Sequence, residues 1–264
     1  MKLIDSHCHL KPFYEKGELD NVLSNSCKAG VFKMLTVGTH SEDWLTYKDL
    51  AVAYPEVIFY SVGLHPCYVD DNWSEQVNFI SSYWSQNTKP RAVGEIGLDY
   101  FRLPKDQVEA TNKRSQQLEC FSIQLQTAVE LDCPVIIHSR HAFDDCLSVI
   151  AESGIDWSKV IFHCFSEGPD KAKKLLDLGA KASFTGLITY EKNELIQNSL
   201  KLFGKDNLIL ETDSPYLSPT PVRKNRNEPA NLMFVAEKAA QILNISTDQV
   251  SAISVSNTID LFKM

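Results

Sequence analysis

The sequence predicts an α/β protein, a single-domain (β/α)8 barrel of the TIM type that spans residues 1–264. Two observations lead to this fold. Eight short apolar runs, rich in β-branched residues, alternate with stretches of helical periodicity. Histidines and carboxylates lie at the ends of most of these runs, where a barrel gathers them on one rim. A doubly wound open sheet has the same alternation, but no G-x-G-x-x-G loop follows the first run to support it.

Each apolar run carries few charges and is followed by a turn or a polar cluster, which predicts a buried strand. The runs cover residues 2–7, 32–39, 57–65, 91–99, 134–139, 159–166, 180–186 and 207–215. The helical stretches have apolar residues at steps of three and four positions. They cover residues 19–30, 113–132, 142–154, 170–180, 231–244 and 247–262. Residues 214–231, with several prolines and a small basic cluster, are expected to form a loop over the site.

The composition limits the class of protein. The chain has 264 residues, 44% hydrophobic residues and a formal net charge of −8. A nucleic-acid partner would therefore need a local source of positive charge. The seven cysteines form no C-x-x-C pair, so we expect free thiols and a cytoplasmic location. No signal-peptide pattern and no apolar run of about 18 residues is present, so we expect no membrane span.

Polar residues that can bind metals collect at the predicted strand ends. Five of the seven histidines lie there, together with several carboxylates from distant parts of the chain. In a barrel these strand ends point to one rim, so the side chains are expected to converge. They are His7, His9, His65, Glu95, Asp99, His138, His163, Glu211 and Asp213.

The first strand explains why two histidines flank one cysteine in DSHCHL. In a strand, residues i and i+2 face the same side, so His7 and His9 can both point into the barrel mouth and hold one cation. Cys8 then points the other way, toward the surrounding helices, and is expected to be a buried neutral thiol.

The donor set suits two divalent ions, either Zn²⁺, Mn²⁺ or Mg²⁺. Two such ions would polarise a bridging water to hydroxide near neutral pH and stabilise an in-line displacement at phosphorus. Their charge would also attract a phosphate to an acidic protein. We expect the first ion on His7, His9 and Asp213, the second on His138 and His163, and Glu95 bridging both.

Four of these residues are candidates for further roles. Glu95 and Asp213 are expected to be catalytic, with Asp213 accepting the proton of the attacking water. His65, in GLHP, is a further catalytic candidate that contacts a phosphate oxygen or assists proton transfer, the alternative being that it only orders its loop. Glu211 faces inward with Asp213 and is either a further metal ligand or a carboxylate that orients an imidazole.

The motifs DSHCHL, VGLHP, GEIGLDY, PVIIHSR, FHCFS and ETDSPYLSP, in this order and at these distances, resemble those of the TatD-type metal-dependent deoxyribonucleases of the amidohydrolase superfamily. The match runs from residue 3 to beyond 229 and includes NEPANL. The resemblance implies a (β/α)8 barrel, a divalent-metal site and hydrolysis of nucleic-acid phosphodiesters, typically at DNA ends from the 3′ side. It also implies metal ligands at His7, His9, Glu95, His138, His163 and Asp213.

The rim supplies candidates for substrate binding. Arg140 either grips a phosphate or forms a salt bridge on the rim. Arg223, with Lys224 and Arg226, either contacts backbone phosphates or belongs to a solvated loop. His40 and His141 are not included in the site. The aromatic residues near strand ends either stack on bases or pack within the protein, and these are Tyr100, Phe101, Phe165 and Tyr216.

We therefore predict a divalent-metal-dependent nuclease, a 3′–5′ exonuclease on DNA that acts as a monomer by attack of a metal-bridging hydroxide. RNA is a second possible substrate. The alternative keeps the metals and changes the bond, as in an ester hydrolase such as a D-aminoacyl-tRNA deacylase. Glu95 disfavours dihydroorotase-like and phosphotriesterase-like enzymes, which bridge their metals with a carboxylated lysine. A scaffold without activity would show eroded ligands, and none is eroded here.

Overall fold

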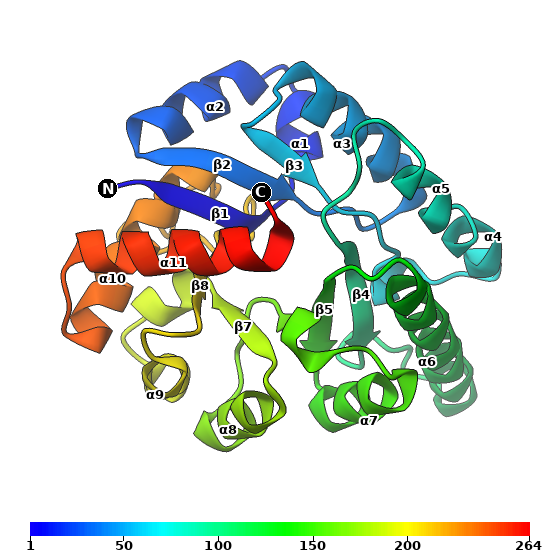
Figure 1. The fold of residues 1–264 in the computed structure, drawn as a ribbon. Coiled ribbons are helices and arrows are strands. Elements are labelled where there is room, and N and C mark those ends of the chain that lie inside the picture. Colours follow the sequence, from blue (N-terminus) through cyan, green and yellow to red (C-terminus); the bar gives the residue numbers. More distant parts are fainter.

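The structure is a computed structural model that describes residues 1–264, and it confirms the (β/α)8 barrel. Parallel strands surround a central axis and helices cover the outside (Figure 1). The strands are β1 (Leu3–Cys8), β2 (Val31–Thr36), β3 (Ile58–Tyr60), β4 (Val93–Asp99), β5 (Val135–Arg140), β6 (Val160–Phe162), β7 (Lys181–Phe184) and β8 (Leu208–Leu210).

The helices of the outer layer include six that agree in position with the predicted stretches. These are α2 (Leu19–Lys28), α6 (Gln107–Glu130), α7 (Phe143–Ser153), α8 (Pro169–Leu178), α10 (Leu232–Leu243) and α11 (Thr247–Phe262). The others were not predicted, and they are α1 (Lys11–Tyr14), α3 (Ser41–Ala53), α4 (Trp73–Val77), α5 (Ile80–Trp84) and α9 (Glu194–Phe203). No helix combines the length and the apolar composition that a membrane span requires.

Two helix boundaries show why the sequence pattern was incomplete. Helix α6 begins six residues before the predicted start, because the Asp106 carboxylate accepts hydrogen bonds from the amides of Val108 and Glu109 at 2.9 and 3.0 Å. Helix α3 buries Trp44 and Tyr47. Because acidic residues flank these aromatic residues, the sequence lacks a clear apolar repeat at steps of three and four positions.

The ring of strands is closed by two weak seams. Neighbouring strands pair in parallel within β1–β3 and within β4–β8. A single bridge between Val62 and Val93 joins β3 to β4, and another between Cys8 and Ser214 joins β8 to β1. The barrel is therefore continuous, but these two joints have few backbone hydrogen bonds of the sheet type.

The inner face of the barrel has an apolar layer with the polar site above it. Ile136, Ile161 and Ile209 belong to one buried cluster inside the ring. Two positions later on the same strand faces come His138, His163 and Glu211. Leu261 and Phe262, at the end of α11, belong to the same cluster and close the floor. Figure 1 shows α11 running across the barrel beside β1, with the C-terminus near the centre.

Buried side chains reinforce the seam between β8 and β1. The Asp5 carboxylate is fully buried and accepts hydrogen bonds from the Thr212 amide at 2.9 Å and the His7 amide at 3.3 Å. Its second oxygen lies 2.5 Å from the Thr212 hydroxyl. Burial raises the pKa of Asp5 to about 8, although these hydrogen bonds oppose the rise. One carboxyl group thus fixes the strand ends that carry His7 and Asp213.

We expect Asp5→Ala to lower the free energy of unfolding by about 2–4 kcal/mol, because two buried amides lose their acceptor. Asp5→Asn is expected to lose much less, since a carboxamide can accept from the amides and donate to Thr212 Oγ1. Urea denaturation at neutral pH, followed by circular dichroism, measures the difference. Equal losses in the two variants would contradict this account of the seam.

Candidate metal centre

Glu95 is the centre of the site, and a glycine two residues later makes its position possible. Glu95 lies within β4 and is only 3% exposed. Gly97 pairs in register with His138 of β5 and has a φ of +134°. A Cβ atom at Gly97 would lie 2.1 Å from the backbone oxygen of His138, so no side chain fits there. This close approach brings Glu95 Oε1 to 2.8 Å from His138 Nδ1.

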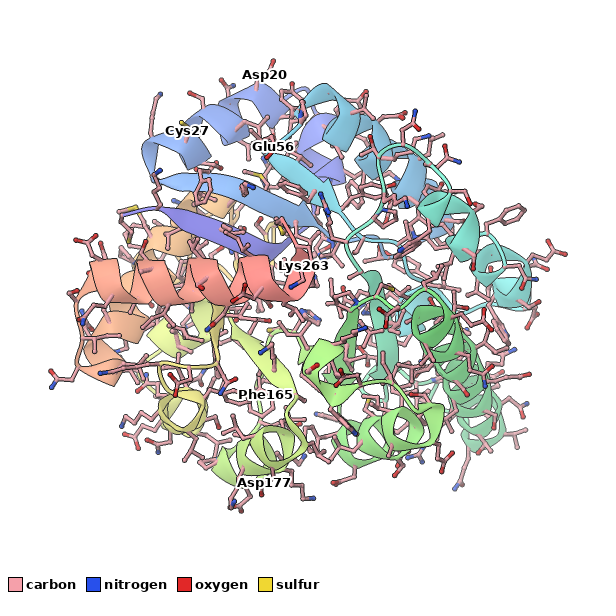
Figure 2. All side chains as sticks on the ribbon, viewed as in Figure 1. Asp20, Cys27, Glu56, Phe165, Asp177 and Lys263 are labelled. Atoms are coloured by element: carbon pink, nitrogen blue, oxygen red, sulfur yellow. The ribbon has the colours of Figure 1, made fainter.

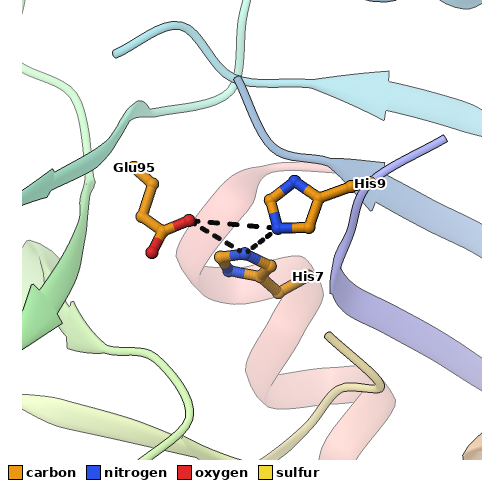
Figure 3. Close-up of side chains that lie close together, drawn as sticks. All are labelled: His7, His9 and Glu95. Atoms are coloured by element: carbon orange, nitrogen blue, oxygen red, sulfur yellow. Dashed lines mark hydrogen bonds and ion pairs between the residues drawn. The ribbon is translucent and has the colours of Figure 1, made fainter. Parts of the chain in front are cut away.

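One oxygen of Glu95 faces the histidines of the first strand. Glu95 Oε2 lies 3.4 Å from His7 Nε2 and 4.0 Å from His9 Nε2, and these two nitrogens are 3.3 Å apart (Figure 3). Asp213 approaches from the loop after β8, and its Oδ1 is 3.4 Å from His9 Nε2 and 3.8 Å from His7 Nε2. Two carboxylate oxygens and two imidazole nitrogens thus surround one point.

The other oxygen of Glu95 faces His138, which lies in β5, and the histidines that follow β3 and β6. Glu95 Oε1 lies 2.8 Å from His138 Nδ1, 2.8 Å from His163 Nε2 and 3.3 Å from His65 Nε2. His138 Nδ1 and His163 Nε2 are 3.4 Å apart. Each Glu95 oxygen therefore has its own set of donors, as the predicted division between two ions requires.

Hydrogen bonds at the far nitrogens determine which atom each ring presents. His9 Nδ1 lies 3.0 Å from the backbone oxygen of Val37, so it carries the hydrogen and Nε2 faces the site with its lone pair. His138 Nε2 lies 3.1 Å from Asp99 Oδ2, so Nδ1 is the free atom. Both rings are oriented by groups outside the cluster, as is common for metal-binding histidines.

His65 is oriented differently from the other histidines. It lies five residues beyond the end of β3 rather than within that strand, and its Nδ1 accepts a hydrogen bond from the Cys67 amide at 3.0 Å. The neutral ring therefore carries its hydrogen on Nε2 and donates it to Glu95. Burial lowers the pKa of His65 to about 4, so the ring is neutral at pH 7.

Glu211 lies behind His163 on the side away from Glu95. It is 1% exposed, and its Oε1 accepts a hydrogen bond from the Cys164 amide at 2.8 Å. The same oxygen is 3.4 Å from His163 Nδ1. This geometry favours the orienting role for Glu211, although His7, His163 and Glu211 also place one ligand atom each within 4.8 Å of one another.

The pKa values follow from the crowding of charges. Burial alone would raise the pKa of Glu95, but the neighbouring imidazoles of His163, His65 and His138 hold it well below its usual value. Burial likewise opposes ionisation of Asp213, and the hydrogen bond from the protonated His9 ring, whose own pKa is raised, lowers the pKa of Asp213. Both carboxyl groups are therefore ionised at neutral pH.

The donor set fits divalent cations. With the His9 hydrogen on Nδ1, the facing atoms of His9, Glu95 and Asp213 are all acceptors. Such atoms repel one another unless protons or a cation lie between them. Without an ion, the cluster is balanced by protonation of histidines, and the carboxylates raise the pKa of His163 well above 6.5 despite burial. Imidazole and carboxylate ligands suit Zn²⁺, Mn²⁺ and Mg²⁺.

The arginines considered for phosphate binding differ in their contacts. Arg140 and Arg223 are exposed and have no carboxylate within 4.0 Å, so Arg140 forms no salt bridge. They stack instead on Phe101 at 3.7 Å and on Tyr190 at 3.8 Å. Arg226 pairs with Glu18 and is held away from a substrate.

Two of the aromatic residues considered for base stacking are used within the protein. Phe165, labelled in Figure 2, is 3% exposed and packs against Phe143, Phe184 and Phe203. The Tyr100 hydroxyl donates to Asp145 at 2.7 Å and Arg114 covers its ring at 4.0 Å. Phe101 and Tyr216 remain exposed at 55% and 59%. Cys8 is buried and bonded to the Leu35 carbonyl, as expected for an outward-facing thiol.

Sequence reasoning placed Asp99 at the rim without a role, and it missed Asp5. The contact between Asp99 and His138 could not be predicted from the spacing of Glu95 and Asp99 in the sequence, because it joins two neighbouring strands. Asp5 carries a usable signal, since it precedes His7 and His9 at the same two-residue step in the sequence.

A barrel of this kind with histidines and carboxylates clustered at its mouth defines a metal-dependent hydrolase. The family model described as "TatD related DNase" matches residues 4–263. The chain belongs to this TatD-related family, as its motifs indicated.

Individual relatives agree with this family. The chain is 34% identical over 266 residues to the "Uncharacterized metal-dependent hydrolase YcfH" of Escherichia coli K12, covering 99% of this chain and 96% of that protein. It is 30% identical over 265 residues to the "Putative deoxyribonuclease tatdn3" of Danio rerio, covering 98% and 96%. Among solved structures, the TatD homologue YJJV of Escherichia coli has a TM-score of 0.87 at 27% identity, covering 99% and 98%.

Raising the pH above about 6.5 is expected to destabilise the metal-free protein. His9, His138 and His163 have pKa values raised above the ordinary 6.5 by the carboxylates around them, despite burial. Their stabilisation is complete below pH 6.5 and is lost as the pH rises through the folded-state values. His7 and His65 have lowered pKa values and add nothing in this window. Thermal unfolding in chelator from pH 6 to 9 measures the loss.

Bound Zn²⁺ or Mn²⁺ should remove most of this dependence, because the ion replaces the protons between the carboxylates. The remaining slope up to about pH 8 is expected to come from Asp5, so Asp5→Asn in the metal-loaded protein is the matched control. The same decline with and without metal would show that the cluster does not bind the ion.

Asp99→Ala is expected to weaken zinc binding by about 10–100-fold, because His138 loses the partner that orients its ring. Asp99→Asn should lose less, since its carbonyl oxygen can still accept from His138 Nε2. Competition with a chromophoric chelator measures the affinity. Asp106→Ala, which removes the cap of α6, is the control. Unchanged affinity in both Asp99 variants would refute the orienting role.

Proposed function

We propose that this hydrolase is a deoxyribonuclease that removes nucleotides from DNA ends in the 3′–5′ direction and requires two divalent ions. The family model and the name of the zebrafish relative both support a nuclease. One observation carries the proposal: the two carboxylate oxygens of Glu95 face separate sets of imidazole nitrogens. Two closely spaced ions suit an in-line displacement at phosphorus.

The proposed roles follow from the contacts. His7, His9 and Asp213 would hold one ion, His138 and His163 would hold the other, and Glu95, whose oxygens face both groups, would contribute to each site. When bound, Zn²⁺, Mn²⁺ or Mg²⁺ would lower the pKa of a water molecule and neutralise charge on the scissile phosphate. Glu211 orients His163.

The remaining residues move protons and bind phosphate in this proposal. Asp213, ionised at neutral pH, is placed to accept the proton of the attacking water. His65 holds a hydrogen on Nε2 at the mouth and can donate it to a phosphate oxygen. Arg140 and Arg223, free of carboxylate partners, are available to backbone phosphates. The proposal includes a monomer acting in the cytoplasm, where the free cysteines would stay reduced.

Stripped protein supplied with 5′-labelled single-stranded DNA and one metal at a time tests the proposal. We expect stepwise shortening from the 3′ end that depends on the metal. Glu95→Ala should lower the rate by about 10³-fold or more, because both ions would lose a ligand. The ions would then stabilise the charge of the transition state less well. Gel electrophoresis of time points gives the rate and the direction.

Glu167→Ala is the matched control. Glu167 follows β6, as His163 does, but its carboxylate pairs with Lys171 at 3.0 Å instead of joining the cluster. Full activity is expected in this variant. An aminoacyl-tRNA ester serves as the competing substrate in parallel reactions. Intact DNA under every metal, together with cleavage of the ester, would overturn the proposed substrate and favour the deacylase.

A further inference from the structure

The arginines of the chain are distributed unevenly between the two ends of the barrel. Two of the six pair with carboxylates, Arg114 with Asp145 and Arg226 with Glu18. A third lies over Phe59, next to the start of β4. The three others have no carboxylate within 4.0 Å, and all follow the carboxyl ends of strands: Arg102, Arg140 and Arg223. Arg91 has no carboxylate partner either, but it lies at the opposite, amino-terminal end of β4. Three of the four arginines without a carboxylate partner therefore lie at the end of the barrel that carries the metal centre.

Exposed aromatic side chains are concentrated at the same rim. Tyr68, which follows β3, is 51% exposed, and Tyr216, which follows β8, is 59% exposed. Phe101 is also exposed, but Arg140 covers one face and His141 lies edge-on at 5.3 Å. No cation stacks on Tyr68 or Tyr216. The His40 ring lies against Tyr68 at a centroid distance of 5.5 Å, but both tyrosine side chains remain more than half exposed and can contact a ligand.

Tyr68 and Tyr216 stand over opposite edges of one cluster. The Tyr68 ring contacts the His65 ring at a centroid distance of 6.1 Å, and the Tyr216 ring contacts the His9 ring at 6.0 Å. Both histidines reach Glu95, at 3.3 and 4.0 Å. Partial burial raises the pKa of the Tyr216 hydroxyl, as expected for a ring that lies against the site while its side chain stays 59% exposed.

Arg102 lies beside this pair. Its amide donates to Asp99 Oδ1 at 3.0 Å, which holds the start of its loop against the site. Its positive charge acts both on the Cys67 thiol, next to Tyr68 in the chain, and on the Tyr216 hydroxyl. Asp99 also accepts a hydrogen bond from the Cys67 thiol at 3.6 Å, so the Arg102 loop lies beside the segment that carries Tyr68. The guanidinium is exposed and has no carboxylate within 4.0 Å.

We propose that Tyr68 and Tyr216 form a clamp for the terminal unpaired base of a single-stranded DNA, and that Arg102 binds the adjoining phosphate. This inference rests on the proposed nuclease function and specifies its substrate. An aromatic ring stacks on any base, so the clamp selects for an unpaired end rather than for a sequence. A blunt duplex end binds more weakly, because its terminal base must first leave its partner and its stack.

The test measures binding without cleavage. The metal-loaded protein is titrated into an oligonucleotide with phosphorothioate linkages and 2-aminopurine as its 3′-terminal base, whose fluorescence is quenched by stacking. We expect quenching, and an affinity at least about 10-fold above that for the same strand in a blunt duplex. Tyr68→Leu and Tyr216→Leu should each weaken binding of the single strand by about 5- to 100-fold and reduce the quenching. Phe79→Leu is the matched control, since Phe79 is 64% exposed and lies beside residues of α3 and α5 rather than beside the histidine cluster.

Arg102→Gln tests the phosphate contact separately. It should weaken binding and make the slope of log affinity against log salt concentration shallower by about 0.7, the value for one phosphate of a single strand. Lys105→Gln, at an exposed position of the same loop, is the control for loss of one positive charge.

Hydrolysis of methyl p-nitrophenyl phosphate, a small diester without a base, distinguishes failure of the clamp from failure of the proposed nuclease activity. Unchanged hydrolysis in the tyrosine variants, with loss of single-strand binding, supports the clamp. Unchanged binding and quenching in both variants would overturn the clamp while leaving the nuclease standing. Hydrolysis of the small diester by a wild-type protein that binds no DNA would instead refute the proposed function.

Discussion

The site depends on one buried carboxylate that five imidazoles approach within 4.0 Å. Glu95 stays ionised in a place that disfavours charge because those rings compensate it. The arrangement requires β4 and β5 to lie so close that only a glycine fits at residue 97. It also requires the seam between β8 and β1, which Asp5 holds, because that seam positions His7 relative to Asp213. Backbone packing and site chemistry are therefore parts of one constraint.

Much of this arrangement could be predicted from the sequence, because parallel strands place their last inward residues at one rim. His138 follows Ile136 and His163 follows Ile161 at the two-residue step of a strand face. Prediction failed where loops decide the direction of a side chain. Phe165 comes only two residues after His163, yet it turns back into the core. The contact of Asp99 with His138 depends on the β4–β5 register, which no periodic pattern contains.

The distribution of charged residues matters more for ligand binding than the net charge of the chain. The net charge of −8 suggests a protein that repels polyanions, whereas the mouth combines unpaired arginines with a cluster suited to cations. A phosphate near the mouth meets favourable charge, and one near the helical surface does not. Aromatic residues divide in the same way, since Phe101 and Tyr190 support arginines while Tyr68 and Tyr216 present open faces.

The closed floor has a consequence for how a long molecule is handled. Leu261 and Phe262 pack beneath the apolar layer and close the barrel at the end away from Glu95. A polymer cannot thread through such a blind pocket, as it can through a ring or tunnel. In the proposed nuclease, the released fragment must therefore leave by the opening through which the remaining strand entered. Turnover on a long chain then requires the departing fragment to clear the mouth before the next residue advances, which makes product departure a natural bottleneck.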